Sequence, residues 1–160
     1  MEQLVNQYSA AWIAGAFVLL VVLILFQRKP RPGDLVALGV IVIGLVLAWV
    51  LLHPTQTPLM GDAKMAQAMI GQGKPVLLEF QSPYCIACTK MKPVVDDLEN
   101  ELGGQLLILR LNVQENAGRE LAKVYGFEFT PTFIYFDGEG NELWRDVGGL
   151  DPGRVRDSLP

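Results

Sequence analysis

Two cysteines in the second half of the chain are spaced for thiol–disulfide chemistry. They enclose two residues in the run Cys85-Ile86-Ala87-Cys88, which follows a predicted buried strand and opens a predicted helix. A thiolate at a helix N-terminus faces unpaired backbone amides and the positive end of the helix dipole, which lower its pKa. A second thiol one turn further on lies on the same face, so it can attack the mixed disulfide formed by the first thiol and release the substrate. The spacing therefore predicts a dithiol exchange centre.

A metal site and a structural disulfide are the other uses of such a cysteine pair. A metal site needs further ligands, and the chain after residue 53 holds no third cysteine and no histidine. Methionines could handle copper, but in helical stripes they are more often core filler. Those considered are Met60, Met65, Met69 and Met91. We therefore expect no metal, whereas an inert structural disulfide stays open for a chain outside the cell.

Helices and strands alternate from about residue 63 onward. Apolar runs predict buried strands, one-sided apolar patterns predict helices, and a DGEG turn predicts a hairpin. The predicted order is helix 63–73, strand 75–81, helix 88–104, strand 105–113, helix 115–126, hairpin 132–147 and helix 151–159. This order fits an α/β fold, with a small mixed sheet and helices on both faces.

The first 53 residues have a different, strongly apolar composition. Two runs, 9–26 and 35–52, each contain 18 residues without a charge. As helices they would each reach about 27 Å, near the hydrocarbon thickness of a bilayer. No lysine or arginine precedes the first run, which argues against a cleavable signal peptide. We therefore expect a transmembrane helical hairpin over 1–53.

The basic residues of this hairpin predict its orientation. Arg28, Lys29 and Arg31 all lie in the link 27–34 between the two apolar runs. Positively charged links stay on the cytoplasmic side of a membrane, so this link is expected in the cytoplasm and both termini outside. The expected location is the cytoplasmic membrane of a prokaryote, with the rest of the chain on its periplasmic face.

A short linker over 54–62 joins the hairpin to a domain over 63–160. Fully extended, the linker spans at most about 30 Å, so the domain is expected to work close to the membrane. Residues 54–160 carry ten basic and fifteen acidic side chains. An acidic domain lacks the basic patch that phosphate binding requires, which argues against nucleic acid as a partner.

Three segments of the domain resemble the thioredoxin superfamily in order and spacing. They are VLLEFQSPYCIACTKMKP around the cysteines, RLNVQENAGRELAKVYGF after them, and FEFTPTFIYFDGEG towards the end. The resemblance covers about 63–159. It implies a thioredoxin fold, with a mixed sheet of four or five strands and helices on both faces, and it implies thiol–disulfide exchange. The opening strand of the family is not evident here, which favours four strands.

The resemblance also implies roles for individual residues. Cys85 matches the exposed attacking cysteine, and Cys88 matches the buried cysteine that resolves the mixed disulfide. Pro131 matches a cis-proline beside the disulfide, and the backbone of Thr130 before it is then expected to pair with a bound substrate strand. Pro93 matches a proline that kinks the helix after the motif.

Glu79 falls where the family carries a buried acid beneath the resolving cysteine, so it is expected to accept a proton from Cys88. Arg110 falls where a basic residue often partners that acid. The alternative interpretation is that these two residues form a solvated pair on the sheet surface. Tyr84 replaces the usual tryptophan before the first cysteine, and with Ile86 and Ala87 of the motif it is expected to contact substrate.

The expected function is a membrane-anchored reductant of disulfides in exported proteins, for example in cytochrome maturation. The motif lacks the histidine that further stabilises the thiolate in strongly oxidising relatives, which favours reduction. The expected cofactor is none beyond the redox-active Cys85–Cys88 disulfide. Neither apolar run contains a cysteine, so a separate membrane thiol carrier must supply electrons. Two alternatives stay open: a non-catalytic binding module with a structural disulfide, and an isomerase or oxidase using the same site.

Overall fold

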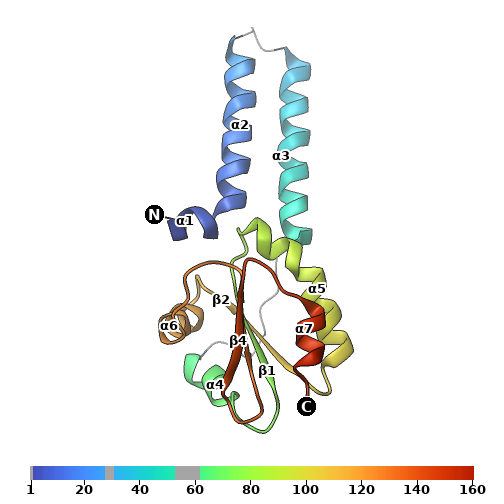
Figure 1. The fold of residues 1–160 in the computed structure, drawn as a ribbon. Coiled ribbons are helices and arrows are strands. Elements are labelled where there is room, and N and C mark those ends of the chain that lie inside the picture. Colours follow the sequence, from blue (N-terminus) through green and yellow to red (C-terminus); the bar gives the residue numbers. More distant parts are fainter. Residues whose placement is uncertain (1, 28–30, 53–61) are drawn as a thin grey trace.

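The computed structural model describes residues 2–27, 31–52 and 62–160. The predicted linker over 54–62 therefore lies outside the described residues except for Asp62, as do residues 28–30 of the expected cytoplasmic link. The described chain forms a four-stranded α/β unit with a pair of long helices at one end (Figure 1).

The sheet contains four strands in the order β2-β1-β3-β4. Their bounds are Val76–Gln81 for β1, Leu107–Asn112 for β2, Thr132–Phe136 for β3 and Glu142–Val147 for β4. Strand β1 is parallel to β2 and antiparallel to β3, which in turn is antiparallel to β4. The predicted mixed sheet is confirmed, and it has four strands.

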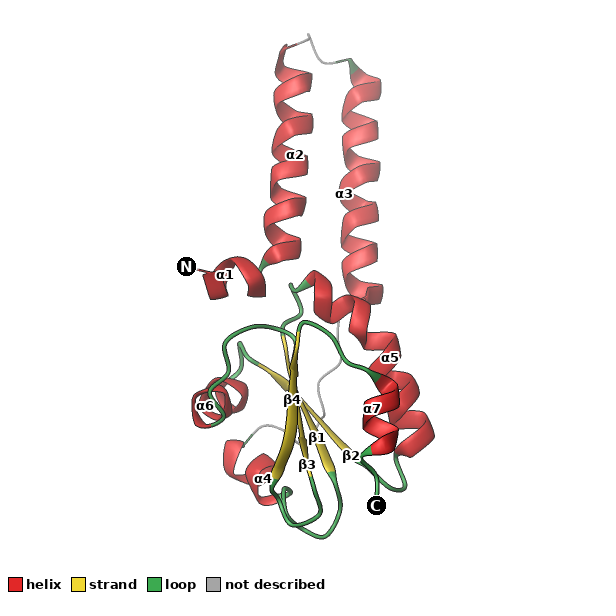
Figure 2. Ribbon diagram, viewed as in Figure 1, coloured by secondary structure: helices red, strands yellow, loops and turns green. Residues whose placement is uncertain are grey.

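Two helices cover each face of the sheet (Figure 2). Helices α4 (Ala63–Ala68) and α6 (Asn116–Val124) pack on one face, and α5 (Ile86–Leu102) and α7 (Pro152–Asp157) pack on the other. The predicted order of helices and strands is therefore confirmed. Helix α4 is shorter than the predicted 63–73, and Gly71 beyond it has a positive φ of 81° that a helix cannot accommodate.

The alternating side chains of β1 divide the core into two layers. Val76, Leu78 and Phe80 pack with α4 and α6, whereas Leu77 packs with α5 and α7. Successive side chains of a strand point to opposite faces, so Glu79 lies on the α5 face. A charged side chain is thus placed inside an otherwise apolar layer, directly beneath the helix that begins at the cysteine motif.

The N-terminal residues form three further helices. They are α1 (Glu2–Gln7), α2 (Ser9–Gln27) and α3 (Pro32–Leu52), and the last two run side by side at the end of the sheet where α5 begins (Figure 1). Within the described residues, no helix has the length and apolar content needed to cross a membrane. The two membrane spans expected over 9–26 and 35–52 are therefore not supported as spans.

A close contact between α6 and the end of β2 predicts a strongly destabilising substitution. A methyl group on Gly118 would overlap the backbone carbonyl of Asn112 and stand 3.0 Å from the backbone nitrogen of Val113. Backbone atoms cannot move aside cheaply, so we expect Gly118→Ala to lower the free energy of unfolding by at least about 2 kcal/mol. Urea unfolding followed by circular dichroism measures this change.

Gly104→Ala provides the matched control, because a methyl group at Gly104 meets no atom within 4 Å. We expect the control to unfold at nearly the wild-type urea concentration. Equal midpoints for the two variants would show that α6 does not pack against the Asn112 carbonyl at Gly118.

Candidate active site

Cys85 and Cys88 lie at the junction between the end of β1 and the start of α5. Cys85 is the N-cap residue of α5, with an extended backbone, and its Sγ accepts a hydrogen bond of 3.3 Å from the backbone N–H of Cys88. Both side chains are buried free thiols. The sequence correctly predicted a helix that starts at the motif, and the geometry puts Cys85 at the amide-rich end of that helix.

The two thiols have opposite pKa shifts. Hydrogen bonding with the Cys88 side chain, reinforced by Thr130 and by backbone amides of the helix start, lowers the pKa of Cys85 to about 6 despite its burial. Burial, followed by the hydrogen bond and charge of Cys85, raises the pKa of Cys88. At neutral pH Cys85 is therefore a thiolate and Cys88 a thiol. Cys85 can attack a disulfide at once, whereas Cys88 keeps its proton until the second step of the exchange.

Thr130 and Pro131 lie beside the first cysteine. The peptide bond between them is cis, as the family resemblance implied. The Cys85 Sγ lies 3.6 Å from the carbonyl oxygen of Thr130, just before β3, and donates a hydrogen bond to it when the thiol is protonated. A strand that paired with the backbone of Thr130 would therefore run directly past the Cys85 sulfur.

Glu79 and Arg110 are buried partners on neighbouring strands. They occupy paired positions of β1 and β2, and the Glu79 carboxylate lies 3.7 Å from Arg110 Nε. Both side chains are at most 5% exposed, so the alternative of a solvated surface pair is wrong. The other two guanidinium nitrogens of Arg110 contact Asp96 at 2.6 Å and Glu99 at 2.9 Å, both on α5.

Asp96 and Glu99 were not predicted as partners of Arg110. Residues three apart lie on the same side of a helix, so the spacing of Asp96 and Glu99 could have indicated that both carboxylates share one basic partner. With Glu79 they surround one guanidinium with three carboxylates. The arrangement holds Arg110 in place, and it leaves Glu79 with only part of the favourable charge interaction that a dedicated pair would give.

The Glu79 carboxyl group is poised to exchange protons near neutral pH. Burial raises its pKa to about 7, while the positive charge of Arg110 opposes the shift and the negative charge of Asp96 adds to it. The charge of Glu79 in turn helps to raise the pKa of Cys88. A carboxyl group with this pKa can accept a proton from a thiol and return it at physiological pH. Its role as proton acceptor stays a prediction.

Cys85 is far less accessible than the sequence led us to expect. The attacking cysteine was expected to be exposed, yet only 1% of Cys85 is accessible. Residues near the N-terminus bond to the positions on either side of it. Ser9 Oγ accepts from the Ile86 N–H at 3.2 Å, and the Ala10 N–H donates to the Tyr84 carbonyl at 2.8 Å. The expectation of an exposed thiol was wrong because it considered the domain alone.

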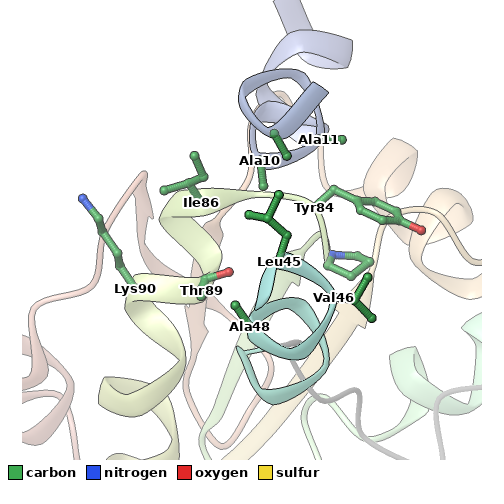
Figure 3. A pocket seen from close by; sticks show the side chains of 11 residues that line it. Ala10, Ala11, Leu45, Val46, Ala48, Tyr84, Ile86, Thr89 and Lys90 are labelled. Carbon is green, nitrogen blue, oxygen red and sulfur yellow. The ribbon is translucent and has the colours of Figure 1, made fainter. Parts of the chain in front are cut away.

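An apolar cavity adjoins the motif between α2, α3 and α5 (Figure 3). Its volume is about 540 Å³, and Tyr84 and Ile86 contribute to its wall opposite side chains such as Leu45. Ala87, expected with them as a substrate contact, is half-buried and contributes a backbone hydrogen bond that lowers the pKa of Cys85. Pro93 lies further along, inside α5, which continues past it to Leu102.

Comparison with known proteins gives consistent matches to one family. The family described as thioredoxin-like domain matches residues 62–160. A thioredoxin of Synechocystis sp. is 33% identical over 94 residues, which are 59% of this chain and 85% of the relative. Thioredoxin 1 of Nostoc sp. is 31% identical over 89 residues, covering 56% and 80% of the two chains. The crystal structure of Fasciola hepatica thioredoxin superposes with a TM-score of 0.53 at 23% identity, covering 62% of this chain and 92% of that one.

Proposed function

Because this chain belongs to the thioredoxin-like family and is a thiol–disulfide oxidoreductase, we propose that it reduces disulfides of exported proteins at the outer face of a prokaryotic cytoplasmic membrane. The observation that carries the proposal is that the pKa values of the two thiols are shifted in opposite directions. Cys85, with a pKa of about 6, is the nucleophile, and Cys88, with its raised pKa, resolves the intermediate.

The proposed reaction transfers two electrons to the substrate. The Cys85 thiolate attacks one sulfur of the substrate disulfide, forms a mixed disulfide, and expels the other substrate sulfur as a thiolate that takes up a proton. Glu79 then accepts the proton of Cys88, whose sulfur attacks Cys85 and expels the second substrate thiolate. The substrate leaves as a dithiol, and the enzyme is left with a Cys85–Cys88 disulfide. Thr130, Pro131 and Tyr84 are proposed to hold the substrate segment beside Cys85.

One observation favours a second candidate, an oxidase or isomerase using the same residues. A thiolate stabilised to a pKa of about 6 makes the reduced form of the enzyme more favourable, which raises its reduction potential. The absence of a histidine between the cysteines acts in the other direction. Equilibration of Cys85 and Cys88 with glutathione buffers separates the two candidates, because a reductant has the more negative potential.

Membrane attachment is the second part of the proposal. Helices α2 and α3 expose large apolar side chains along their length, among them Phe17, Leu20 and Val40, and such side chains are costly in water. We propose that these side chains attach the helical pair to a lipid bilayer, with the rest of the chain at its outer face. Electrons then come from a separate membrane thiol carrier, because residues 9–26 and 35–52 contain no cysteine.

The experiment that tests the proposal uses Cys88→Ser to trap substrates. Without the resolving thiol, the mixed disulfide between Cys85 and a substrate should accumulate, because nothing on the enzyme attacks it. We expect disulfide-linked complexes with exported proteins in membranes of expressing cells. They should stay in the membrane pellet at alkaline pH and dissolve in detergent, as visible on non-reducing gels.

The matched control is the double variant Cys85→Ser with Cys88→Ser, which should trap nothing. Complexes formed only with cytoplasmic proteins would contradict the proposed location. Complexes that alkaline buffer releases from the membrane would contradict attachment by the helical pair.

A further inference from the structure

The side chain of Asn6 occupies the backbone position where a substrate is expected to pair. Its Oδ1 accepts hydrogen bonds from the backbone N–H of Thr130 at 2.7 Å and from the Thr130 hydroxyl at 2.8 Å. Its Nδ2 donates to the carbonyl oxygen of Thr130 at 3.1 Å. The amide of one side chain thus satisfies both backbone groups of the residue before the cis-proline.

A side-chain amide carries the same donor and acceptor as a peptide bond. A substrate strand that pairs with Thr130 must offer a carbonyl oxygen to its N–H, and this N–H has only one hydrogen to donate. Asn6 and a substrate therefore cannot both have well-formed hydrogen bonds to this N–H. Asn6 is in this sense an internal substitute for the substrate backbone.

The residues after Asn6 hold it there by contacts on the other side of Cys85. The Ser82 hydroxyl donates to the carbonyl oxygen of Gln7 at 2.7 Å, and the ring of Tyr8 stacks on the ring of Tyr84 with 5.4 Å between centroids. The bonds of Ser9 and Ala10 to the motif continue the same line of contacts. We call residues 6–10 the plug segment. Its contacts run from the cis-proline loop to the first turn of α5, with Cys85 between them.

We propose that the plug segment holds the enzyme in a closed state in which Cys85 cannot reach a substrate, and that substrates react only after this segment leaves Thr130 and Tyr84. The inference rests on the proposed function, since it names a control of the same site. It also defines the partner that opens the site: an extended peptide segment that pairs with the Thr130 backbone and places an aromatic or apolar side chain on Tyr84. A peptide with both features replaces the backbone hydrogen bonds that Asn6 makes to Thr130 and the ring contact that Tyr8 makes to Tyr84.

The test compares Asn6→Ala with the unchanged chain in the same mild detergent. Two rates are measured at pH 7: alkylation of Cys85 by iodoacetamide, located by mass spectrometry of the peptides, and reduction of insulin disulfides. Loss of three hydrogen bonds favours the open state, so we expect both rates to rise about tenfold. Tyr8→Ala, which removes the ring contact instead, should raise both rates as well.

Asn100→Ala is the matched control, because Asn100 is exposed on α5, and it should leave both rates unchanged. Suppose that Cys85 is alkylated no faster in Asn6→Ala and Tyr8→Ala than in the wild type, while insulin reduction still requires Cys85. The proposed closed state is then wrong and the proposed function stands. If alkylation of Cys85 accelerates but no variant reduces a protein disulfide, closure of the site by the plug segment is supported and the proposed function fails. Slower alkylation of Cys85 in both variants would also contradict closure of the site by the plug segment.

Discussion

Replacement of Cys85 by serine is expected to lower the rate of insulin disulfide reduction by about a thousandfold or more. The cause is the loss of the thiolate. Cys85 ionises with a pKa of about 6, so most of it is charged at pH 7, whereas a serine hydroxyl stays protonated there. Serine also cannot form the mixed disulfide. Turnover of insulin with dithiothreitol as the electron source measures the effect.

Cys88→Ser is the informative comparison for this variant. It should lose turnover too, but it should still form one mixed disulfide per molecule, because the attacking sulfur and its hydrogen bond from the residue 88 backbone N–H remain. Cys85→Ser should form none. If Cys85→Ser kept more than a tenth of the wild-type rate, Cys85 would not be the nucleophile.

Replacement of Glu79 by glutamine is expected to change how stability depends on pH. The folded state raises the pKa of Glu79 from 4.5 to about 7, so the folded state binds the proton more tightly than the unfolded state does. This proton binding favours folding below pH 4.5, and the advantage is lost as the pH rises to about 7 and above. Each pKa unit is worth about 1.4 kcal/mol, so the wild type should lose about 2–3 kcal/mol from this group between pH 5 and pH 8.

Glutamine cannot ionise, so the Glu79→Gln variant lacks that loss. Relative to the wild type, its free energy of unfolding should therefore increase by about 2–3 kcal/mol between pH 5 and pH 8, as measured by urea unfolding of the reduced protein at both values. Glu120→Gln removes an exposed carboxylate on α6 and should show the wild-type pH dependence. A constant difference between Glu79→Gln and the wild type would mean that Glu79 titrates as it would in water.

The parts of the site that were predictable are those that depend on local sequence. The apolar run before Cys85 and the amphipathic run after it were enough to place the thiol at a helix start. The order of apolar and amphipathic runs likewise predicted a small mixed sheet, whereas the preference for four strands over five came from the family resemblance. The cis bond before Pro131 came from resemblance alone, because spacing does not distinguish cis from trans.

The parts that were not predictable depend on contacts between distant residues. Asn6 and Thr130 are 124 positions apart, and Ser9 and Ile86 are 77 apart, so no local pattern links them. The burial of Cys85 follows from these contacts, which is why its exposure was misjudged. The carboxylates around Arg110 were missed for a related reason, because their pairing depends on how α5 lies across β2.

Ser9 belongs to two elements at once, because it is the first residue of α2 and its hydroxyl also accepts from the backbone N–H of Ile86, the first residue of α5. A tilt or rotation of α2 as a rigid rod stretches this bond and the neighbouring one from Ala10 to Tyr84. The orientation of α2 and the accessibility of the Cys85 sulfur next to it are therefore coupled through these two hydrogen bonds.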